Sequence, residues 1–161
     1  MRPFRFALAL VRALRRTRFR VGALGRATWG ESFIIGPRSQ SARASRFIAG
    51  SRVNIGADFV NHGNLVIGDD VMISSHVSVI GNDHPFDSSS KTIQDFEPTA
   101  PAKVEIEGDN LIGFGTVIVG PVRIGRGTIV GAGSLVTRDL PADSVAYGRP
   151  AVVQRRRRGP S

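Results

Sequence analysis

Aliphatic residues recur at every sixth position over long parts of this 161-residue chain. β-Branched residues keep this spacing without a slip at Ile106, Ile112, Ile118, Ile124, Val130 and Val136. An upstream block has the same period, and a second apolar column runs two residues ahead of the first, at Val53, Phe59, Leu65, Val71 and Val77. A six-residue period fits neither a helix nor simple strand alternation, but it fits short strands joined by tight corners. We therefore predict stacked coils of short parallel strands, in which each column forms a continuous core.

The composition agrees with such a fold and excludes several kinds of site. The chain contains 19 glycines, which permit the backbone angles of sharp corners. It contains no cysteine, so disulfides, thiolate metal sites and a cysteine nucleophile are excluded. No apolar run approaches the ~20 residues that a membrane-spanning helix needs.

The net charge of +9 is distributed unevenly along the chain. Residues 1–52 contain twelve Arg and one acid, whereas residues 53–154 contain six Lys or Arg and twelve acids. The segment Arg155–Arg158 adds four more positive charges. Such an asymmetry indicates an anionic partner for the basic flanks, such as a membrane surface, phosphate groups or nucleic acid. For the last residues, 154–161, the alternative is a solvated, disordered tail.

The repeat loses its register between Val79 and Ile106, which are 27 residues apart, because 27 is not a multiple of six. The segment of about residues 80–103 is rich in Asn, Asp, Ser and Pro and is typical of a protruding loop. His84 lies at the mouth of this loop. Its side chain suits proton transfer near neutral pH, which makes it a candidate catalytic residue. The alternative is an ordinary surface histidine.

The repeats and the segment IGRGTIVGAGSLVTRDLPADSVAYGRPAVV, residues 124–153, resemble the hexapeptide-repeat acyltransferases. The resemblance covers about residues 48–153 and is closest to galactoside, maltose and polysaccharide O-acetyltransferases. Members of that family fold as a left-handed parallel β-helix with three hexapeptides in each triangular coil. The resemblance implies an all-β fold with a left-handed β-helix domain (31–153) that carries the loop. The charge distribution sets apart a basic N-terminal segment (1–30) and a basic tail (154–161).

The same resemblance implies a coenzyme A-dependent O-acetyltransferase. It would move an acetyl group from acetyl-CoA to a sugar hydroxyl, most naturally of a cell-surface polysaccharide or its precursor. His84, in the setting GNDHPFD, would be the general base. Asn61 would contact the acceptor, with Asn64 as the alternative, although Asn61 could instead be a stacked, internally hydrogen-bonded core amide. Asp83 and Asp87 flank the base on the substrate side, and either of them, or a backbone carbonyl, could orient the imidazole.

Acetyl-CoA would lie along the last coils, in a groove between the subunits of a homotrimer. Matching the family position by position gives candidate donor contacts at Ala132, Thr137, Arg138, Arg149 and Arg155. Arginine suits the phosphates of coenzyme A. Two further candidates for the donor site depart from the family pattern. Leu111 stands where a Trp is usual, and Phe114 stands where a small polar residue is common, so Phe114 could replace the missing aromatic ring.

Two other functions remain open. A non-catalytic scaffold could keep the fold and lack donor binding, which the departures at Leu111 and Phe114 would permit. A metal enzyme resembling the γ-class carbonic anhydrases would use the same β-helix, with zinc bound by three histidines. The spacing of His62, His76 and His84 does not follow that family's pattern, so we expect no metal.

Residues 2–21 predict an amphipathic basic helix, in which five arginines fall within about 80° of arc. A secretory signal is not expected, because the apolar core Ala7–Val11 is short and Arg12 follows at once. The helix could cap the open end of the β-helix, or it could lie on an anionic membrane. We expect a cytoplasmic protein, and the second alternative adds peripheral contact at the inner face of the membrane. No motif supports nucleic-acid binding.

Overall fold

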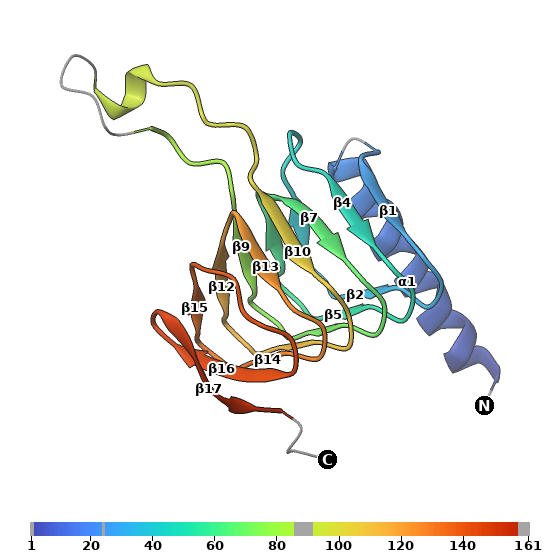
Figure 1. Cartoon of the computed structure of the whole chain (residues 1–161). Helices are drawn as coiled ribbons and strands as arrows, with labels where there is room; N and C mark the ends of the chain where they lie inside the picture. The colour runs from blue at the N-terminus through green and yellow to red at the C-terminus, as the bar shows by residue number, and fades with distance from the viewer. Residues whose placement is uncertain (1, 24, 86–91, 158–161) are drawn as a thin grey trace.

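The computed structural model describes residues 2–23, 25–85 and 92–157 and shows a triangular solenoid of short strands (Figure 1). Helix α1 (Arg2–Gly22) precedes the solenoid, and a short 3₁₀ helix, η1 (Ile93–Asp95), lies in its protruding loop. Three parallel sheets form the three sides of each coil. The predicted all-β fold, a parallel β-helix with a short N-terminal helix and a loop, is confirmed.

The strands of the three sides alternate along the chain. The first side contains β1 (Ala27–Trp29), β4 (Phe47–Ala49), β7 (Asn64–Ile67), β10 (Lys103–Ile106) and β13 (Val122–Ile124). The second side contains β2 (Ile34–Ile35), β5 (Asn54–Ile55), β8 (Met72–Ile73), β11 (Leu111–Ile112), β14 (Ile129–Val130), β16 (Ser144–Gly148) and the antiparallel β17 (Ala151–Arg156). The third side contains β3 (Gln40–Ser41), β6 (Val60–Asn61), β9 (Ser78–Ile80), β12 (Val117–Val119) and β15 (Leu135–Val136). One strand from each side makes a coil, so β1–β3 form the first coil and β13–β15 the fifth.

The strand register locates the interruption of the repeat. Leu65 pairs with Phe47, 18 positions earlier, which corresponds to three hexapeptides per coil. Val104 pairs with Leu65, 39 positions earlier, so 21 additional residues lie between β9 and β10. The described parts of this insertion, residues 81–85 and 92–102, form the arm that projects from the β-helix in Figure 1. The expected loop at about 80–103 is therefore present.

The six-residue columns form the core of the solenoid. The downstream column is exposed by no more than 1 % at each of its positions, Ile106, Ile112, Ile118, Ile124, Val130 and Val136. The column two residues ahead of it is buried on the same inner face, because side chains two apart on a strand point the same way. Each buried aliphatic side chain contributes roughly 1.5–3 kcal/mol relative to its exposed state.

The corners between the sides repeat one backbone conformation. Residues with positive φ stack between the first and second sides at Ser32, Arg52, Asp70, Asp109, Gly127 and Asp143. They stack between the second and third sides at Arg38, Asp58, His76, Gly115 and Gly133. Some of the charged corner residues pair between coils, as Arg52 does with Asp70 at 2.5 Å. The corners are therefore both turns and points of contact between coils.

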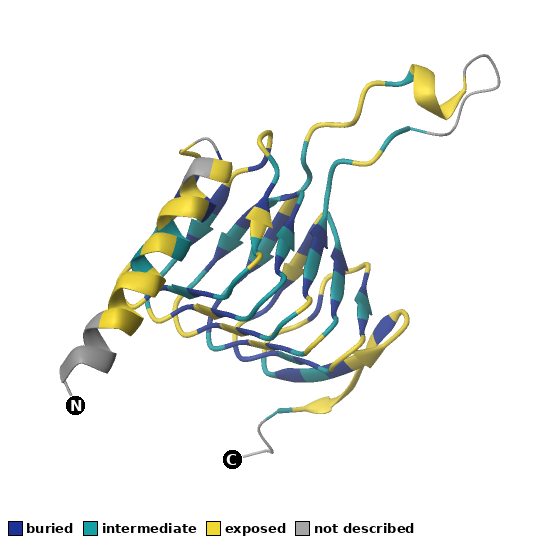
Figure 2. Cartoon of the chain, turned by 180° about the vertical axis from the view of Figure 1, so that it is seen from behind, coloured by how far each residue is buried: buried dark blue, intermediate teal, exposed yellow. Residues whose placement is uncertain are grey.

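Helix α1 lies along the open end of the first coil (Figure 2). Phe19 is buried there, and its ring meets that of Phe47 edge-on with 5.0 Å between centroids. The guanidinium of Arg20 lies 4.4 Å from the ring centre of Trp29. The first strand of the β-helix begins at Ala27. It therefore lies inside the N-terminal segment 1–30 that the sequence separates from the β-helix domain. No described helix is long and apolar enough to cross a membrane.

Candidate active site

The loop that carries His84 leaves the β-helix at the corner between the third and first sides (Figure 1). Its outgoing and returning arms are joined at the base. The N–H of Ala102 donates to the carbonyl of Gly81 at 2.5 Å. The side-chain amide of Asn64 donates to the carbonyl of Pro101 at 2.8 Å. The point at which His84 leaves the body is therefore defined by hydrogen bonds to the coils.

The half-buried imidazole of His84 is oriented by a backbone carbonyl from the returning arm. Nδ1 lies 2.8 Å from the carbonyl oxygen of Phe96, twelve residues further along the chain. A carbonyl oxygen only accepts hydrogen bonds, so Nδ1 carries the proton in this contact. In the neutral ring, Nε2 then presents the lone pair that a general base requires. Sequence reasoning does not single out Phe96, because a carbonyl partner has no residue-type signature.

Asp83 holds the loop rather than the imidazole. Its Oδ1 accepts a hydrogen bond from the backbone N–H of His84 at 2.9 Å. Its carbonyl accepts from both the backbone N–H and the hydroxyl of Thr99, at 3.0 and 2.8 Å. Asp83 thus ties the two arms of the loop together on either side of His84. Asp87 lies outside the described residues.

Asn61 lies in the interior of the β-helix, not on the outside of the loop base. Its exposed fraction is 0 %. Its Nδ2 donates to Ser41 Oγ at 2.9 Å, and its Oδ1 accepts from the N–H of Gly63 at 3.2 Å. A buried amide with both halves bonded is a core residue, so the expected contact of Asn61 with the acceptor does not fit. Asn64, the alternative, is half-buried and engaged in closing the loop.

The candidate donor contacts gather on the last coil and the hairpin that follows it. All of them are exposed: Ala132, Thr137, Arg138, Arg149 and Arg155. Arg149 lies between β16 and β17, and its Nη1 donates to the carbonyl of Gly133 at 3.3 Å. This contact brings Arg149 to the corner that contains Ala132. At the C-terminal end of the solenoid, the guanidinium of Arg149 therefore lies beside the exposed corner at Ala132.

Leu111 and Phe114 lie on the outer face of the second side, away from the core. Their exposed fractions are 38 % and 56 %. Met72 pairs with Leu111 in the neighbouring strand and is exposed by 57 %. All three line a shallow cavity of about 370 Å³. Together they form an apolar stripe along the outside of the β-helix.

His76 is a corner residue, with a φ of 60°. Its ring centre lies 5.0 Å from that of Phe114, and its Nε2 lies 3.5 Å from a carboxylate oxygen of Asp58. Arg38 donates to both oxygens of Asp58 at 2.6 Å, and these bonds lower the pKa of that carboxyl. The contacts of His76 thus belong to a ladder of corner residues, which indicates a structural role.

Within one chain, His84 and the donor candidates lie at different levels of the solenoid. His84 follows β9 in the third coil, whereas Thr137 and Arg138 follow β15 in the fifth. At the usual strand spacing of ~4.8 Å, two coils correspond to about 10 Å along the axis. The arm beyond His84 projects outward from the body (Figure 1). One chain thus presents the two halves of the candidate site at separate places.

Across the described ranges, no group of three metal-ligating side chains is found.

The fold and its six-residue repeat define a hexapeptide β-helix protein, and comparison with known sequences agrees. The family model for the bacterial transferase hexapeptide (six repeats) matches residues 103–138. The galactoside O-acetyltransferase of Lactococcus lactis subsp. lactis (strain IL1403) is 33 % identical over 110 residues, which cover 68 % of this chain and 52 % of that protein. The 2,3,4,5-tetrahydropyridine-2,6-dicarboxylate N-acetyltransferase of Staphylococcus aureus (strain JH9) is 51 % identical over 57 residues, 35 % of this chain and 24 % of that one. The chain spans about half the length of the curated relatives that it matches over the longest stretches.

Solved structures share the fold. The hexapeptide-repeat-containing acetyltransferase VCA0836 from Vibrio cholerae superposes with a TM-score of 0.73 at 23 % identity, over 92 % of this chain and 82 % of that one. The same Vibrio protein has been solved in complex with acetyl coenzyme A. A maltose O-acetyltransferase from Clostridium difficile 630 gives a TM-score of 0.62 at 26 % identity, over 83 % of this chain and 60 % of that one. These structures share the β-helix fold, and the family model matches the hexapeptide repeats of residues 103–138.

Proposed function

We propose that the protein transfers an acetyl group from acetyl-CoA to a hydroxyl of a sugar, with His84 as the general base. The observation that carries the proposal is the hydrogen bond from His84 Nδ1 to the carbonyl of Phe96. It leaves Nε2 as the acceptor in the neutral ring, at the mouth of a loop on a rigid scaffold. Relatives named as galactoside and maltose O-acetyltransferases support this reaction class.

The reaction needs one proton acceptor and one site for a developing oxyanion. Nε2 of His84 takes the hydroxyl proton of the acceptor as its oxygen attacks the thioester carbonyl, and the new C–O bond forms. The carbonyl oxygen becomes negative, and a backbone N–H beside the donor groove stabilises it. Collapse of the intermediate breaks the C–S bond, and the departing coenzyme A thiolate recovers the proton from the imidazolium. The carbonyl of Phe96 stabilises that imidazolium while it carries the charge.

The donor is assigned to the last coil and the β16–β17 hairpin. Arg138, Arg149 and Arg155 would meet phosphate groups of coenzyme A, which suit the fork geometry of guanidinium. The exposed backbone at Ala132 and Thr137 would hold the pantetheine arm by hydrogen bonds. Leu111 and Phe114 supply an apolar wall on the outer face of the second side, where the family more often has a Trp and a small polar residue.

The two halves of the site would meet between copies of the chain in a homotrimer. His84 follows β9, two coils before the donor candidates, and lies on the outgoing side of an arm that projects from the body (Figure 1). The C-terminal hairpin also exposes apolar side chains, with exposed fractions of 51 % for Tyr147, 44 % for Val152 and 45 % for Val153. A neighbouring copy that covers them would place its own loop beside this donor groove.

The expected acceptor is a polysaccharide or its precursor, and the loop of residues 80–103 would shape its site. A non-catalytic scaffold is the second candidate, because Leu111 and Phe114 alter the donor wall. Calorimetric titration with acetyl-CoA separates the two, since a scaffold without donor binding gives no heat of binding.

The proposal is tested by coenzyme A thiol release from acetyl-CoA over a panel of glycans and simple sugars. We expect acceptor-dependent release with at least one saccharide, and an acetyl ester on that product by mass spectrometry. Donor binding without turnover on a broad panel would leave the reaction class unsupported, and absence of donor binding would contradict it.

A further inference from the structure

Helix α1 carries an apolar face that its own β-helix leaves uncovered. Leu10 and Leu14, one turn apart, are exposed by 55 % and 61 %, whereas Phe19 is exposed by 3 %. At 100° per residue, both leucines lie about 140–180° around the helix from Phe19. Figure 2 shows this outer surface of α1 at the end of the solenoid. Solenoid ends need a polar outer face for solubility, so exposed leucines at this position indicate a partner.

The charge of the same helix selects the kind of partner. Residues 2–22 contain seven arginines and no acidic residue: Arg2, Arg5, Arg12, Arg15, Arg16, Arg18 and Arg20. Residues 53–154, the greater part of the β-helix, contain twelve acids against six basic residues. An anionic surface therefore attracts the capped end more strongly than residues 53–154. The arginines of the C-terminal hairpin are the competing basic site, and a control variant tests that end. Pairing of this helix with the same helix of another copy would instead bring like charges together.

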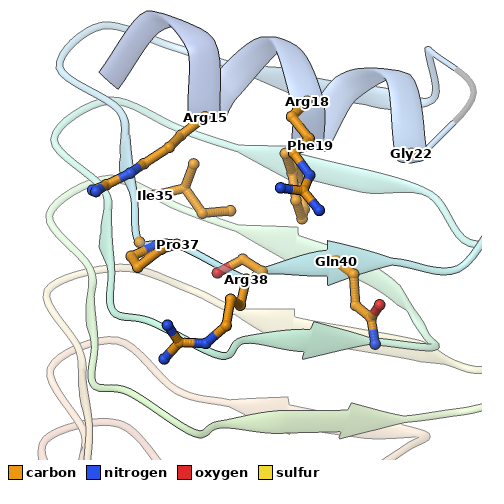
Figure 3. A pocket seen from close by; sticks show the side chains of 10 residues that line it. Arg15, Arg18, Phe19, Gly22, Ile35, Pro37, Arg38 and Gln40 are labelled. Atoms are coloured by element: carbon orange, nitrogen blue, oxygen red, sulfur yellow. The ribbon is translucent and has the colours of Figure 1, made fainter. Parts of the chain in front are cut away.

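A cleft beside the helix carries guanidinium groups above an apolar surface (Figure 3). The cleft has a volume of about 670 Å³ and lies between α1 and the turn that joins β2 to β3. In Figure 3, Arg15 and Arg18 extend from α1 toward this turn. Arg38, on the opposite wall, is bonded to Asp58 at 2.6 Å. The apolar part of the cleft is lined by Phe19, Ile35 and Pro37.

We propose that the capped end of the β-helix docks on a lipid bilayer that contains anionic phospholipid. Leu10 and Leu14 enter the boundary between headgroups and acyl chains, and the helix lies in the plane of the interface. At 100° per residue, Arg18 lies about 40° from Leu14 and reaches the level of the lipid phosphates. Arg15, nearer to the body, lines the cleft, which receives one phosphate. In a cyclic oligomer whose axis runs along the solenoid, all copies of α1 lie at one end, which multiplies the attachment. This docking does not depend on the proposed acetyl transfer.

The test is co-sedimentation of the full chain with vesicles of phosphatidylcholine alone and of phosphatidylcholine with phosphatidylglycerol. We expect binding to the anionic vesicles only, and weaker binding as salt is raised. Replacing Leu10 and Leu14 by Gln, at exposed positions, should weaken binding by at least about tenfold without changing the melting temperature. The double change Arg15→Gln and Arg18→Gln should give a similar loss, on the basis of about 1 kcal/mol per basic residue at an anionic surface.

The matched control is the double change Arg126→Gln and Arg156→Gln, which removes the same charge from exposed positions at the other end of the solenoid. It should retain binding within about twofold. Equal loss in this control would show attraction by net charge alone and would overturn the docking site. Binding that is insensitive to the leucine change would overturn it as well. So would a change of oligomeric mass in the leucine variant, because the face would then be an interface between copies.

Discussion

At the scale of single residues, the candidate base is positioned by the backbone of its own loop. The Nδ1 of His84 bonds to the carbonyl of Phe96, and Asp83 joins the same two arms through Thr99. None of these contacts uses a second charged side chain against the imidazole. The geometry of the base therefore depends on closure of the loop, and residues that close it act as positioning residues.

The change Asp83→Ala tests this dependence. Loss of the Oδ1 acceptor loosens the backbone at His84, so we expect kcat to fall by roughly tenfold while KM for acetyl-CoA stays unchanged. Asp83→Asn keeps an oxygen at Oδ1 and should retain most of the rate. Steady-state kinetics of the three proteins decide the matter, and equal losses in Ala and Asn variants would point to the charge of Asp83 instead.

Glu107 gives a prediction for stability against pH. Its carboxylate accepts from the backbone N–H of Arg126 at 2.8 Å and from the guanidinium of Arg123, and these bonds lower its pKa. A pKa that is lower in the folded state means stabilisation that is fully present above the unfolded value and is lost as pH falls through the folded one. Glu107→Gln should therefore melt below the wild type at pH 7, and the difference should begin to narrow once pH falls below the ordinary glutamate pKa of about 4.3. A difference that persists unchanged at low pH would contradict this account.

Asn61 shows where residue-level reasoning from sequence stops. The six-residue count correctly predicts that position 61 lies in the inner column, next to Val79 in the adjacent strand. The resemblance assigns it to the acceptor, whereas the structure shows bonds to Ser41 and Gly63 in the interior. The sequence could not decide between a contact with the acceptor and a core amide. The deciding partner is Ser41, 20 positions earlier in the first coil, where the hexapeptide pattern is weak.

At the scale of elements, the regular coils were predictable and the first coil was not. Phe47 pairs with Ala27, 20 positions earlier, so the first coil is two residues longer than the regular 18-residue coils. Both extra residues lie at the corner between β3 and β4, where they shift the count of six. Small or polar residues such as Ala27 and Ser41 also replace the aliphatic column there. The contact between Phe19 and Phe47 likewise joins elements that no periodicity connects.

Strand β11 allows a matched test of the core column. Ile112 is fully buried and Leu111, its neighbour, points outward with 38 % exposure. Ile112→Ala should lower the free energy of unfolding by about 2–5 kcal/mol, since it leaves a cavity in a close-packed column. Leu111→Ala should cost well under about 1 kcal/mol. Urea denaturation of both variants measures the difference, and similar losses would mean that the assignment of inner and outer faces is wrong.

At the scale of the whole molecule, we propose that a neighbouring copy completes the site. The projecting loop, the donor candidates two coils away and the exposed hairpin all favour contact between copies (Figure 1). Sequence alone could not place these parts relative to one another. Their separation along the axis depends on how the coils stack, which the local residue pattern does not show. The capped end, with α1, faces away from the hairpin end and stays available for the bilayer.

Sedimentation equilibrium tests the assembly. A trimer of the 17.3 kDa chain has a mass of about 52 kDa. We expect this mass at the protein concentrations at which acetyl-CoA turnover is measured. A monomer with full activity would contradict a site shared between copies.

The most direct measurement is the rate of thiol release from acetyl-CoA by wild type and His84→Ala, at equal trimer concentration and with an accepted saccharide. His76→Ala serves as the control, because His76 is an exposed corner residue of the same type. We predict that His84→Ala loses about 10²- to 10⁴-fold in rate with its trimer and donor binding intact, while the control stays close to wild type. A His84→Ala protein as active as the wild type would contradict the proposed mechanism.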